Sequence, residues 1–458
     1  RGGLARLYTG MGGGDLVARM GLPAGSNLGE LGKGAVILVI ASDLHEEAPV
    51  WYLRLKAAAE RGARLIVAGA RPTKLEHYAS QVVRYAYGEE RDTLQAFLDG
   101  ADRSFHEAEQ AVIFFGGEGL DLAASQDLVQ ACADLLAASE KIGKVNCGLV
   151  GVWSAPNTQG AWDQGFRPSA GLADEIAAAG LVWVAAADPA GDQPALASAL
   201  DTARFVVVQE LFLSETARKA DVVFPAQSML EREGTYTSGE RRVQRFYPVI
   251  YPPAQAKVDY AITALAAFQA GTLIEHRAAS LAFLRLAAET PGYTGLNYQA
   301  LGTTSEQWPV IGRSDLYFGG TGYENKLGMG VHLNPVETAG DTPIGGPSAP
   351  RRSEPAAEEI LLVPVTRLYD QGTLLRATTL LDQRKAQPAL WLHPETAARL
   401  GLAEGELAEF GLDGLAVTLP VVLDETVPAG AGLAPRSTGI SLSAPAVVRP
   451  VRAAVREA

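Results

Sequence analysis

Residues 35–79 read AVILVIASDLHEEAPVWYLRLKAAAERGARLIVAGARPTKLEHYA, and this stretch decides the fold. The unbroken apolar run at residues 35–41 predicts a strand, and a second run at residues 64–68 predicts another. Residues 49–61 between them predict a helix, with Pro49 in the first turn and Gly62 just past the end. Apolar strands without polar alternation, joined by a helix, indicate a parallel sheet covered on both faces.

The same alternation continues to about residue 270. Further strands are expected at residues 111–115, 144–152, 181–187, 204–209 and 222–224, with helices near residues 121–139, 194–203 and 258–270. This pattern predicts an α/β fold of doubly wound parallel sheets. We expect a first, dinucleotide-binding-like α/β domain over residues 1–110 and a second α/β domain over residues 111–271.

The chain changes character after residue 271. Residues 272–336 are rich in Gly, Tyr and Asn and predict an irregular excursion, and residues 340–359 have the composition of a linker, so the third unit spans residues 272–359. Short strands at residues 360–367, 407–410 and 417–423 alternate with turns, and a helix at residues 394–400 ends at Gly401. Residues 360–458 are therefore expected to form a small C-terminal β-barrel.

Residues 220–245, ADVVFPAQSMLEREGTYTSGERRVQR, are the strongest indication of a binding site. A buried strand at residues 222–224 stops at Pro225 and is followed by a polar turn rich in charge and hydroxyl groups. Such a turn belongs at the carboxyl edge of a sheet, where open α/β sheets bind ligands.

Composition narrows the class of protein. The chain has 458 residues, of which 47% are hydrophobic and 20% charged, with a net charge of −13. A globular protein of several domains is indicated, and an acidic chain is a poor nucleic-acid binder. The apolar runs are too short to span a bilayer. Cys132 and Cys147 are expected to be reduced, and two thiols cannot hold a four-iron cluster alone. The chain opens on Arg1 without a signal-like segment, so we expect its true N-terminus to be missing.

Three polar or glycine-rich segments have competing interpretations. His45, Glu46 and Glu47 after the first strand suggest a metal ligand or a general base, or the polar first turn of a helix, which is favoured. Residues 115–119 (FGGEG) fit either close approach to a pyrophosphate or a tight strand-to-helix turn, which is favoured. Residues 10–14 (GMGGG) lack the spacing of a phosphate-binding loop and predict a plain loop.

Two further sets of residues are weighed in the same way. Glu231, Glu233 and Arg241 are expected either to form a buried ion network or to line a pocket. His393, which precedes Pro394, is expected to cap a helix rather than to bind a ligand.

Four segments in order resemble the molybdopterin-dependent oxidoreductase family. Residues 35–79 resemble its dinucleotide-binding half-sheet, and SAPNTQGAWDQG (residues 154–165) resembles its Asn-rich loop beside the metal. Residues 220–245 match a further motif. Residues 390–410 and 424–435 resemble its C-terminal barrel. The resemblance implies the fold of domains 2 and 3 of formate dehydrogenase followed by a small barrel.

The chain departs from this family at the positions of its catalytic and cofactor-binding residues. Active members usually have Gly-x-Asn-Pro after the first strand and Asp-Pro-Arg after the second, whereas residues 41–44 read ASDL and residues 69–72 read GARP. Residues 7–9 stand near the position of the metal-binding Cys or selenocysteine and hold no thiol. Trp153 stands where those enzymes have a catalytic Arg. A thiolate for the metal and a cation for the substrate are therefore missing from these positions.

This profile is similar to the large peripheral-arm subunits of respiratory complex I, the NADH:quinone oxidoreductase. The resemblance implies a cofactor-free scaffold without catalytic or metal-binding residues in this segment. Its vestigial pterin-facing candidates are Asp43, Arg71, Asn157, Glu233 and Thr235. It also implies [2Fe-2S] and [4Fe-4S] clusters in a missing N-terminal part, and NADH-binding and iron–sulfur subunits as partners. The expected location is the cytoplasmic side of the inner (plasma) membrane, as a peripheral part of a membrane complex.

Two rival interpretations remain open at this point. The first is the catalytic subunit of a formate dehydrogenase-type oxidoreductase with a bis-molybdopterin guanine dinucleotide cofactor. The second is a stand-alone chain encoded apart from its cluster-bearing half.

Overall fold

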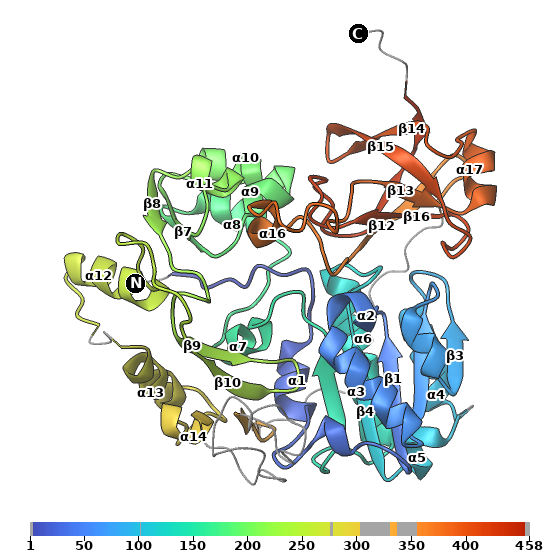
Figure 1. Ribbon diagram of the computed structural model, residues 1–458, viewed down its shortest axis with the longest axis horizontal. Helices are drawn as coiled ribbons and strands as arrows, with labels where there is room; N and C mark the ends of the chain where they lie inside the picture. The colour runs from blue at the N-terminus through green and yellow to red at the C-terminus, as the bar shows by residue number, and fades with distance from the viewer. Residues whose placement is uncertain (1–2, 101, 275–277, 303–329, 337–354, 454–458) are drawn as a thin grey trace.

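The computed structural model describes residues 3–100, 102–274, 278–302, 330–336 and 355–453. In these ranges the chain forms two parallel α/β sheets, a small antiparallel sheet and a curled C-terminal sheet (Figure 1). The predicted fold class is confirmed. None of the described helices is long and apolar enough to cross a membrane.

The first sheet is parallel and five-stranded, in the order β3-β2-β1-β4-β5. Its strands are β1 (Ala35–Ile40), β2 (Arg64–Gly69), β3 (Gln81–Arg84), β4 (Gln110–Phe115) and β5 (Gly148–Gly151). The expected boundary at residue 110 falls inside this sheet, because β4 pairs with β1 from Ala35↔Gln110 to Ile40↔Phe115. The strand expected at residues 144–152 is shorter than predicted and begins only at Gly148.

Helices cover both faces of this sheet, because alternate side chains of each strand point to opposite sides. Val36, Leu38 and Ile40 pack under one set of helices, and Ile37 and Val39 pack under another. Burying each such side chain stabilises the fold by about 1.5–3 kcal/mol. The helices of this unit are α1 (Gly14–Met20), α2 (Leu44–Glu47), α3 (Pro49–Glu60), α4 (Glu90–Leu98), α5 (Ser104–Glu107) and α6 (Leu122–Ala138), with 3-10 turns at Leu28–Glu30 and Lys74–Tyr78.

The second parallel sheet has three strands in the order β6-β7-β8. They are β6 (Val182–Ala185), β7 (Val206–Glu210) and β8 (Val222–Pro225), accompanied by α7 (Thr158–Asp163), α8 (Leu172–Ala178), α9 (Pro189–Asp192), α10 (Pro194–Thr202) and α11 (Glu215–Arg218). The polar turn expected after β8 is only partly a turn. Its second half forms an antiparallel hairpin of β9 (Gly234–Thr237) and β10 (Arg242–Phe246), because Thr, Tyr and Val suit a pleated surface.

The region expected to be irregular contains regular structure. After α12 (Asp259–Gln269) come α13 (Ala279–Glu289), α14 (Tyr298–Gly302) and β11 (Val331–His332), which extends the hairpin sheet. Phe283, Tyr293 and Leu301 bury against Val243 of β10, so tertiary packing overrides the Gly-rich composition here. The linker at residues 340–359 lies mostly outside the described residues.

The C-terminal sheet has seven strands in the order β17-β12-β16-β13-β15-β14-β18. It curls until β14 contacts β17, which gives the expected barrel-like shape. Its elements are β12 (Ile360–Val365), α16 (Thr373–Arg376), β13 (Leu390–Leu392), α17 (Pro394–Leu400), β14 (Leu407–Leu412), β15 (Leu415–Leu423), β16 (Ala431–Pro435), β17 (Ala446–Val448) and β18 (Val451–Arg452). Figure 1 shows this unit over the end of the five-stranded sheet where α2 lies.

The helix-end predictions in this unit are confirmed. The His393 side chain accepts a hydrogen bond from the Glu395 amide at the start of α17, and Gly401 ends the helix in the left-handed conformation with φ of 69°.

Candidate functional site

The carboxyl edge of the five-stranded sheet gathers charged side chains from three strand ends. The strand order reverses at β1, so the crevice between β1 and β4 is the switch point where open α/β sheets bind ligands. Asp43 follows β1, Arg71 follows β2 and Glu118 follows β4. All three side chains are only 8–9% exposed.

Arg71 connects the two acids. Its Nε and one terminal nitrogen donate to the two Glu118 oxygens at 2.9 and 2.7 Å, and the same terminal nitrogen lies 3.2 Å from Asp43 Oδ2. The Tyr87 hydroxyl also donates to Glu118, at 2.9 Å. The sequence pointed to Asp43 and Arg71 but not to Glu118. The sequence nevertheless contained an indication of Glu118. This residue is the glutamate of the FGGEG turn, which follows a strand that ends at the same edge of the sheet.

Asp43 keeps one oxygen for a further partner. Burial raises the pKa of its carboxyl group, and Arg71 opposes that shift. Oδ2 faces Arg71, whereas Oδ1 is buried and accepts no hydrogen bond within the described part of the chain. An unpaired buried acceptor costs about 1–3 kcal/mol, so this oxygen suits a ligand that donates an N–H or O–H.

The FGGEG segment forms a tight turn, as favoured. The Gly116 amide donates to the Ile40 carbonyl and the Glu118 amide donates to the Ala41 carbonyl, both at 3.0 Å. These amides are thus used by the end of β1 and are not aimed at a phosphate. Gly116 allows this approach, because a Cβ there would lie 2.3 Å from the Ala41 oxygen.

Ala41 itself adopts a left-handed conformation with φ of 52°. An alanine in this conformation carries about 1–2 kcal/mol of strain. Backbone strain therefore sits directly beside Asp43, at the switch point.

The His45–Glu47 segment forms α2, as favoured. His45 Nδ1 lies 3.3 Å from Glu46 Oε1, and its Nε2 lies 3.3 Å from Lys74 Nζ. Within the described ranges, no cluster of three or more His, Cys, Asp or Glu side chains is arranged to hold a metal ion. The segment gives no support to a metal site of its own.

Trp153 and Asn157 follow β5 on the same edge of the sheet. The Trp153 ring packs edge-to-face on Phe115 with centroids 5.5 Å apart, and its buried Nε1 donates to no described group. Asn157 Oδ1 accepts a hydrogen bond from the Thr237 amide at 2.9 Å, which fixes the Asn-rich loop to the hairpin. Trp153 thus offers an unused donor at the end of β5.

The acidic residues of the hairpin do not gather into one network. Glu231 accepts from the Ser228 amide, and Glu233 pairs with Arg245 at 2.8 Å. Thr235 lies opposite Arg245 in the β9–β10 register. The first alternative for Glu231, Glu233 and Arg241, an ion network, is wrong, because these side chains contact different partners.

Arg241 instead belongs to a second buried cluster. It is 1% exposed and donates to the carbonyls of Ala18 and Asn334 at 2.9 and 2.7 Å. Another nitrogen lies 3.5 Å from Asp163, which also accepts from the Tyr293 hydroxyl at 2.9 Å. The five pterin-facing candidates therefore lie in three places: Asp43 with Arg71, Asn157 on Thr237, and Glu233 with Thr235 beside Arg245.

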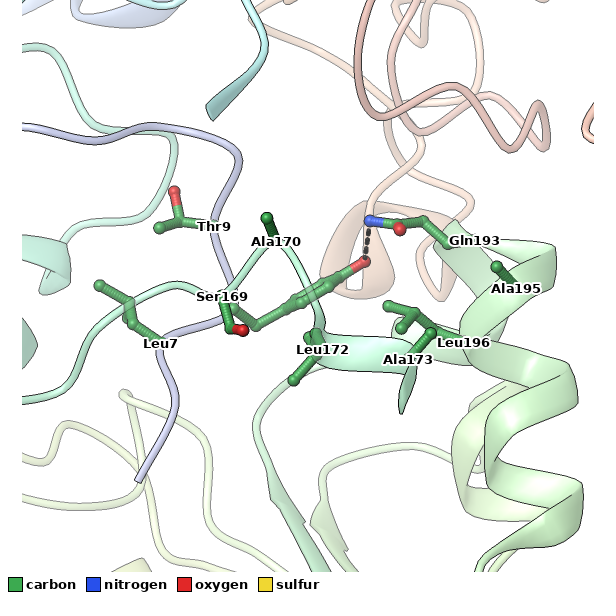
Figure 2. Close-up of a pocket in the computed structure, with 10 residues that line it drawn as sticks. Leu7, Thr9, Ser169, Ala170, Leu172, Ala173, Gln193, Ala195 and Leu196 are labelled. Carbon is green, nitrogen blue, oxygen red and sulfur yellow. Dashed lines mark hydrogen bonds between the residues drawn. The ribbon is translucent and has the colours of Figure 1, made fainter. Parts of the chain in front are cut away.

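Residues 7–9 line a cavity of about 220 Å³ between the N-terminal segment and the second α/β unit (Figure 2). Ser169, Leu172 and Gln193 complete much of its wall. The Tyr8 hydroxyl donates to Asp192 at 3.1 Å and accepts from Gln193 at 3.4 Å, the bond dashed in Figure 2. Burial raises the pKa of both Tyr8 and Asp192.

The N-terminal segment continues from this cavity to the first sheet. Gly12 donates its amide to Ser125 Oγ at 2.8 Å, and Met11 packs against Gly117 beside the Asp43 cluster. Residues 7–9 are therefore connected to the switch point by only a few residues of chain.

Both cysteines lie away from this edge. Cys147 Sγ accepts from the Ala111 amide at 3.3 Å, at the amino end of β4, and Cys132 is buried in α6. Both are free, and burial raises the pKa of each thiol. Neither is placed to offer a thiolate at the switch point.

The Molybdopterin oxidoreductase model matches residues 13–267, more than half of the chain. The chain belongs to the molybdopterin oxidoreductase family. The "F420-dependent formate dehydrogenase 2 subunit alpha" of Methanococcus maripaludis is 29% identical over 351 residues, which is 67% of this chain and 50% of that protein. A putative formate dehydrogenase of Staphylococcus haemolyticus is 41% identical over 133 residues, 28% of this chain and 14% of that protein. The alignment thus covers about half the length of the first of these relatives and 14% of the second.

Among solved structures, acetylene hydratase from Pelobacter acetylenicus aligns with a TM-score of 0.60 and 17% identity. The alignment covers 93% of this chain and 73% of that one, and at this identity it shows the fold alone. The expected family is confirmed. The expected closeness to a complex I subunit is not shown by these relatives, whose names point to formate dehydrogenases.

Proposed function

We propose that this chain forms the pterin-holding part of the large subunit of a formate dehydrogenase-type oxidoreductase. The observation that carries the proposal is the buried Asp43 Oδ1 without a partner at the switch point. The ring N–H and amino groups of a pterin or guanine are donors that such an oxygen accepts. The family model matches the segment that holds this acid, and relatives named formate dehydrogenase resemble the chain.

The residues fit the organic part of the cofactor better than its metal. Asp43 Oδ1 offers an acceptor, Trp153 Nε1 offers a donor, and hydroxyl and amide groups line the cavity at residues 7–9. No thiolate stands at these positions among the described residues. When bound, the molybdenum–pterin group would supply the two-electron chemistry. The groups of this chain would bind it, orient it and exclude water from it.

The test is the cofactor content of the purified chain, produced in a host that makes molybdopterin. Molybdenum is measured by mass spectrometry and pterin by fluorescence after oxidation. We expect about one pterin or more per chain, and at least a tenfold lower content after Asp43→Leu. Glu60→Gln, which changes an exposed carboxylate on α3, is the matched control and should keep the wild-type content. A folded wild-type chain free of pterin contradicts the proposal.

The second candidate is the cofactor-free scaffold of a complex I large subunit. It is favoured by Arg71, whose guanidinium is already used by Glu118 and Asp43, and by Trp153 in place of a substrate-binding cation. This candidate predicts no pterin in the same experiment. It also predicts stoichiometric co-purification with NADH-binding and iron–sulfur subunits at the cytoplasmic side of the membrane.

A further inference from the structure

An exposed apolar surface lies beside α12, at the end of the molecule opposite β3 (Figure 1). Two segments form it: the end of the stretch that follows β8, and the loop that leads from β10 to α12. The apolar patch consists of six residues, each at least 43% exposed: Met229, Leu230, Tyr247, Val249, Ile250 and Tyr251.

Backbone hydrogen bonds hold the two segments side by side. The amides of Val249 and Ile250 both donate to the Leu230 carbonyl, at 2.8 and 3.1 Å. At the far end of the loop, the Gln227 amide donates to the Lys257 carbonyl at 3.1 Å. The apolar patch is therefore a formed surface, and a partner that binds it loses little free energy in ordering the loop.

The composition of the loop is that of an interface core. Residues 247–256 read YPVIYPPAQA, with no charged side chain and with three prolines that restrict the backbone. The centres of protein interfaces are depleted of charged residues and enriched in aromatic ones, as Tyr247 and Tyr251 are enriched here. The apolar patch thus has the side chains that an interface buries.

The size of the apolar patch also fits an interface. Tyr251 is 98% exposed, and the six residues together expose about 700 Å². The largest apolar patch of a typical monomer measures about 300–600 Å², whereas a stable interface buries about 800 Å² on each partner. Two copies of the apolar patch would together bury about 1,400 Å², which lies within the range of stable complexes.

Charge favours a second copy of this chain as the partner. The chain carries a net charge of −13, so two copies repel each other, and they approach best through a surface without charge. A two-fold axis brings the same surface together from both copies, and an uncharged apolar surface is complementary to itself. An anionic membrane attracts a basic surface, and residues 247–256 contain no basic side chain.

We propose that the apolar patch is the two-fold interface of a homodimer, in which Ile250 and Tyr251 of one copy pack against the same residues of the other. The apolar patch lies away from α2 and the carboxyl edge of the first sheet (Figure 1). Dimerisation is therefore separate from the proposed binding of a pterin, and either proposal stands without the other.

Sedimentation velocity and light scattering of the full 458-residue chain, between about 1 and about 100 µM, test the proposal. We expect a mass twice the 48.2 kDa of one chain at the upper concentrations. Ile250→Lys places one buried charge from each copy at the axis and should weaken dimerisation at least about a hundredfold. Leu380→Lys changes a leucine 92% exposed in the barrel unit and is the matched control, which should dimerise like the wild type.

Two further measurements distinguish a direct contact from a folding defect. A mixture of Ile250→Lys and Ile250→Glu should dimerise at least about tenfold more tightly than either variant alone, because the two-fold axis sets the opposite charges against each other. Both native cysteines are buried, so Tyr251→Cys adds an exposed thiol that should form a covalent dimer on oxidation, whereas Leu380→Cys should not. A chain that stays monomeric at every concentration overturns the proposal, even if lipid vesicles bind it. A dimer that Ile250→Lys leaves intact overturns it as well.

Discussion

Two buried arginines hold this chain together in different ways. Arg71 lies at the edge of a sheet, 9% exposed on its side chain, and joins acids that follow neighbouring strands. Arg241 lies 1% exposed in the interior and joins α1, α7 and the segment at Asn334, which are far apart in the sequence. The first cluster leaves an acceptor open toward a ligand edge, whereas the second ties the hairpin into the framework. A buried ion pair is therefore no sign of a binding site by itself. Its position relative to strand ends decides what it does.

The sharpest test of this contrast is Arg241→Met. Removing the guanidinium leaves Asp163 buried with Tyr293 and Gln159 as its remaining partners, and removes a donor from the carbonyls of Ala18 and Asn334. We expect a loss of about 3–5 kcal/mol in unfolding free energy, measured by urea denaturation. Arg218→Met, which changes an arginine 56% exposed beside Glu215, should cost less than about 0.5 kcal/mol. Similar losses in the two variants would refute the framework role of Arg241.

Arg71→Met should lower the unfolding free energy, measured by urea denaturation at pH 8, by about 2–4 kcal/mol. This loss is somewhat smaller than that of Arg241→Met, because water reaches the sheet edge more readily. Asp43 and Glu118 then face each other without a cation, which raises the pKa of Asp43 further. Protonation relieves the repulsion, so the loss should shrink toward pH 5. Arg71→Met combined with Glu118→Leu should recover at least half of the loss. A loss that is independent of pH contradicts this account.

A glycine in the hairpin turn offers a steric test of how the β9–β10 hairpin is packed against the first sheet. A Cβ on Gly239 would lie 1.8 Å from the carbonyl oxygen of Gly151, at the end of β5. Gly239→Ala should push the hairpin away from the first sheet and cost about 2–3 kcal/mol in urea denaturation. Gly411→Ala in β14 has open space around its Cβ and should change the stability by less than about 0.5 kcal/mol. Equal effects would show that the hairpin tip is not packed as described.

The sequence was sufficient where structure depends on local patterns. Apolar runs located β1, β2 and β4, Pro49 and Gly62 bounded α3, and His393 and Gly401 bounded α17. The sequence was not sufficient where packing between distant segments determines the structure. The predicted boundary at residue 110 ignored the pairing of β4 with β1, and α13 was missed because it packs against the β9–β10 hairpin, more than thirty residues earlier in the chain.

The residues of the candidate site also differ in how well the sequence predicts them. Asp43 and Arg71 follow recognisable strands and could be placed at one edge in advance. Glu118 could not, because it lies inside a glycine-rich turn. Glu231, Glu233 and Arg241 suggested either one network or a pocket, but Glu231 turns back to the Ser228 amide, Glu233 pairs with Arg245 and Arg241 enters the interior.

Trp153→Phe should give the smallest change in stability and the most specific change in binding. Phenylalanine can keep an aromatic contact with Phe115, and it removes the buried N–H that has no described partner together with part of the ring volume. The unfolding free energy should fall by about 1–2 kcal/mol, because the smaller ring leaves a small cavity while the loss of an unpaired N–H offsets part of that cost. If that N–H donates to a bound pterin, the retained pterin should fall about tenfold, a typical consequence of losing one hydrogen bond to a ligand. Unchanged pterin content in the folded variant would place Trp153 outside the ligand edge and leave Asp43 as the polar group that defines it.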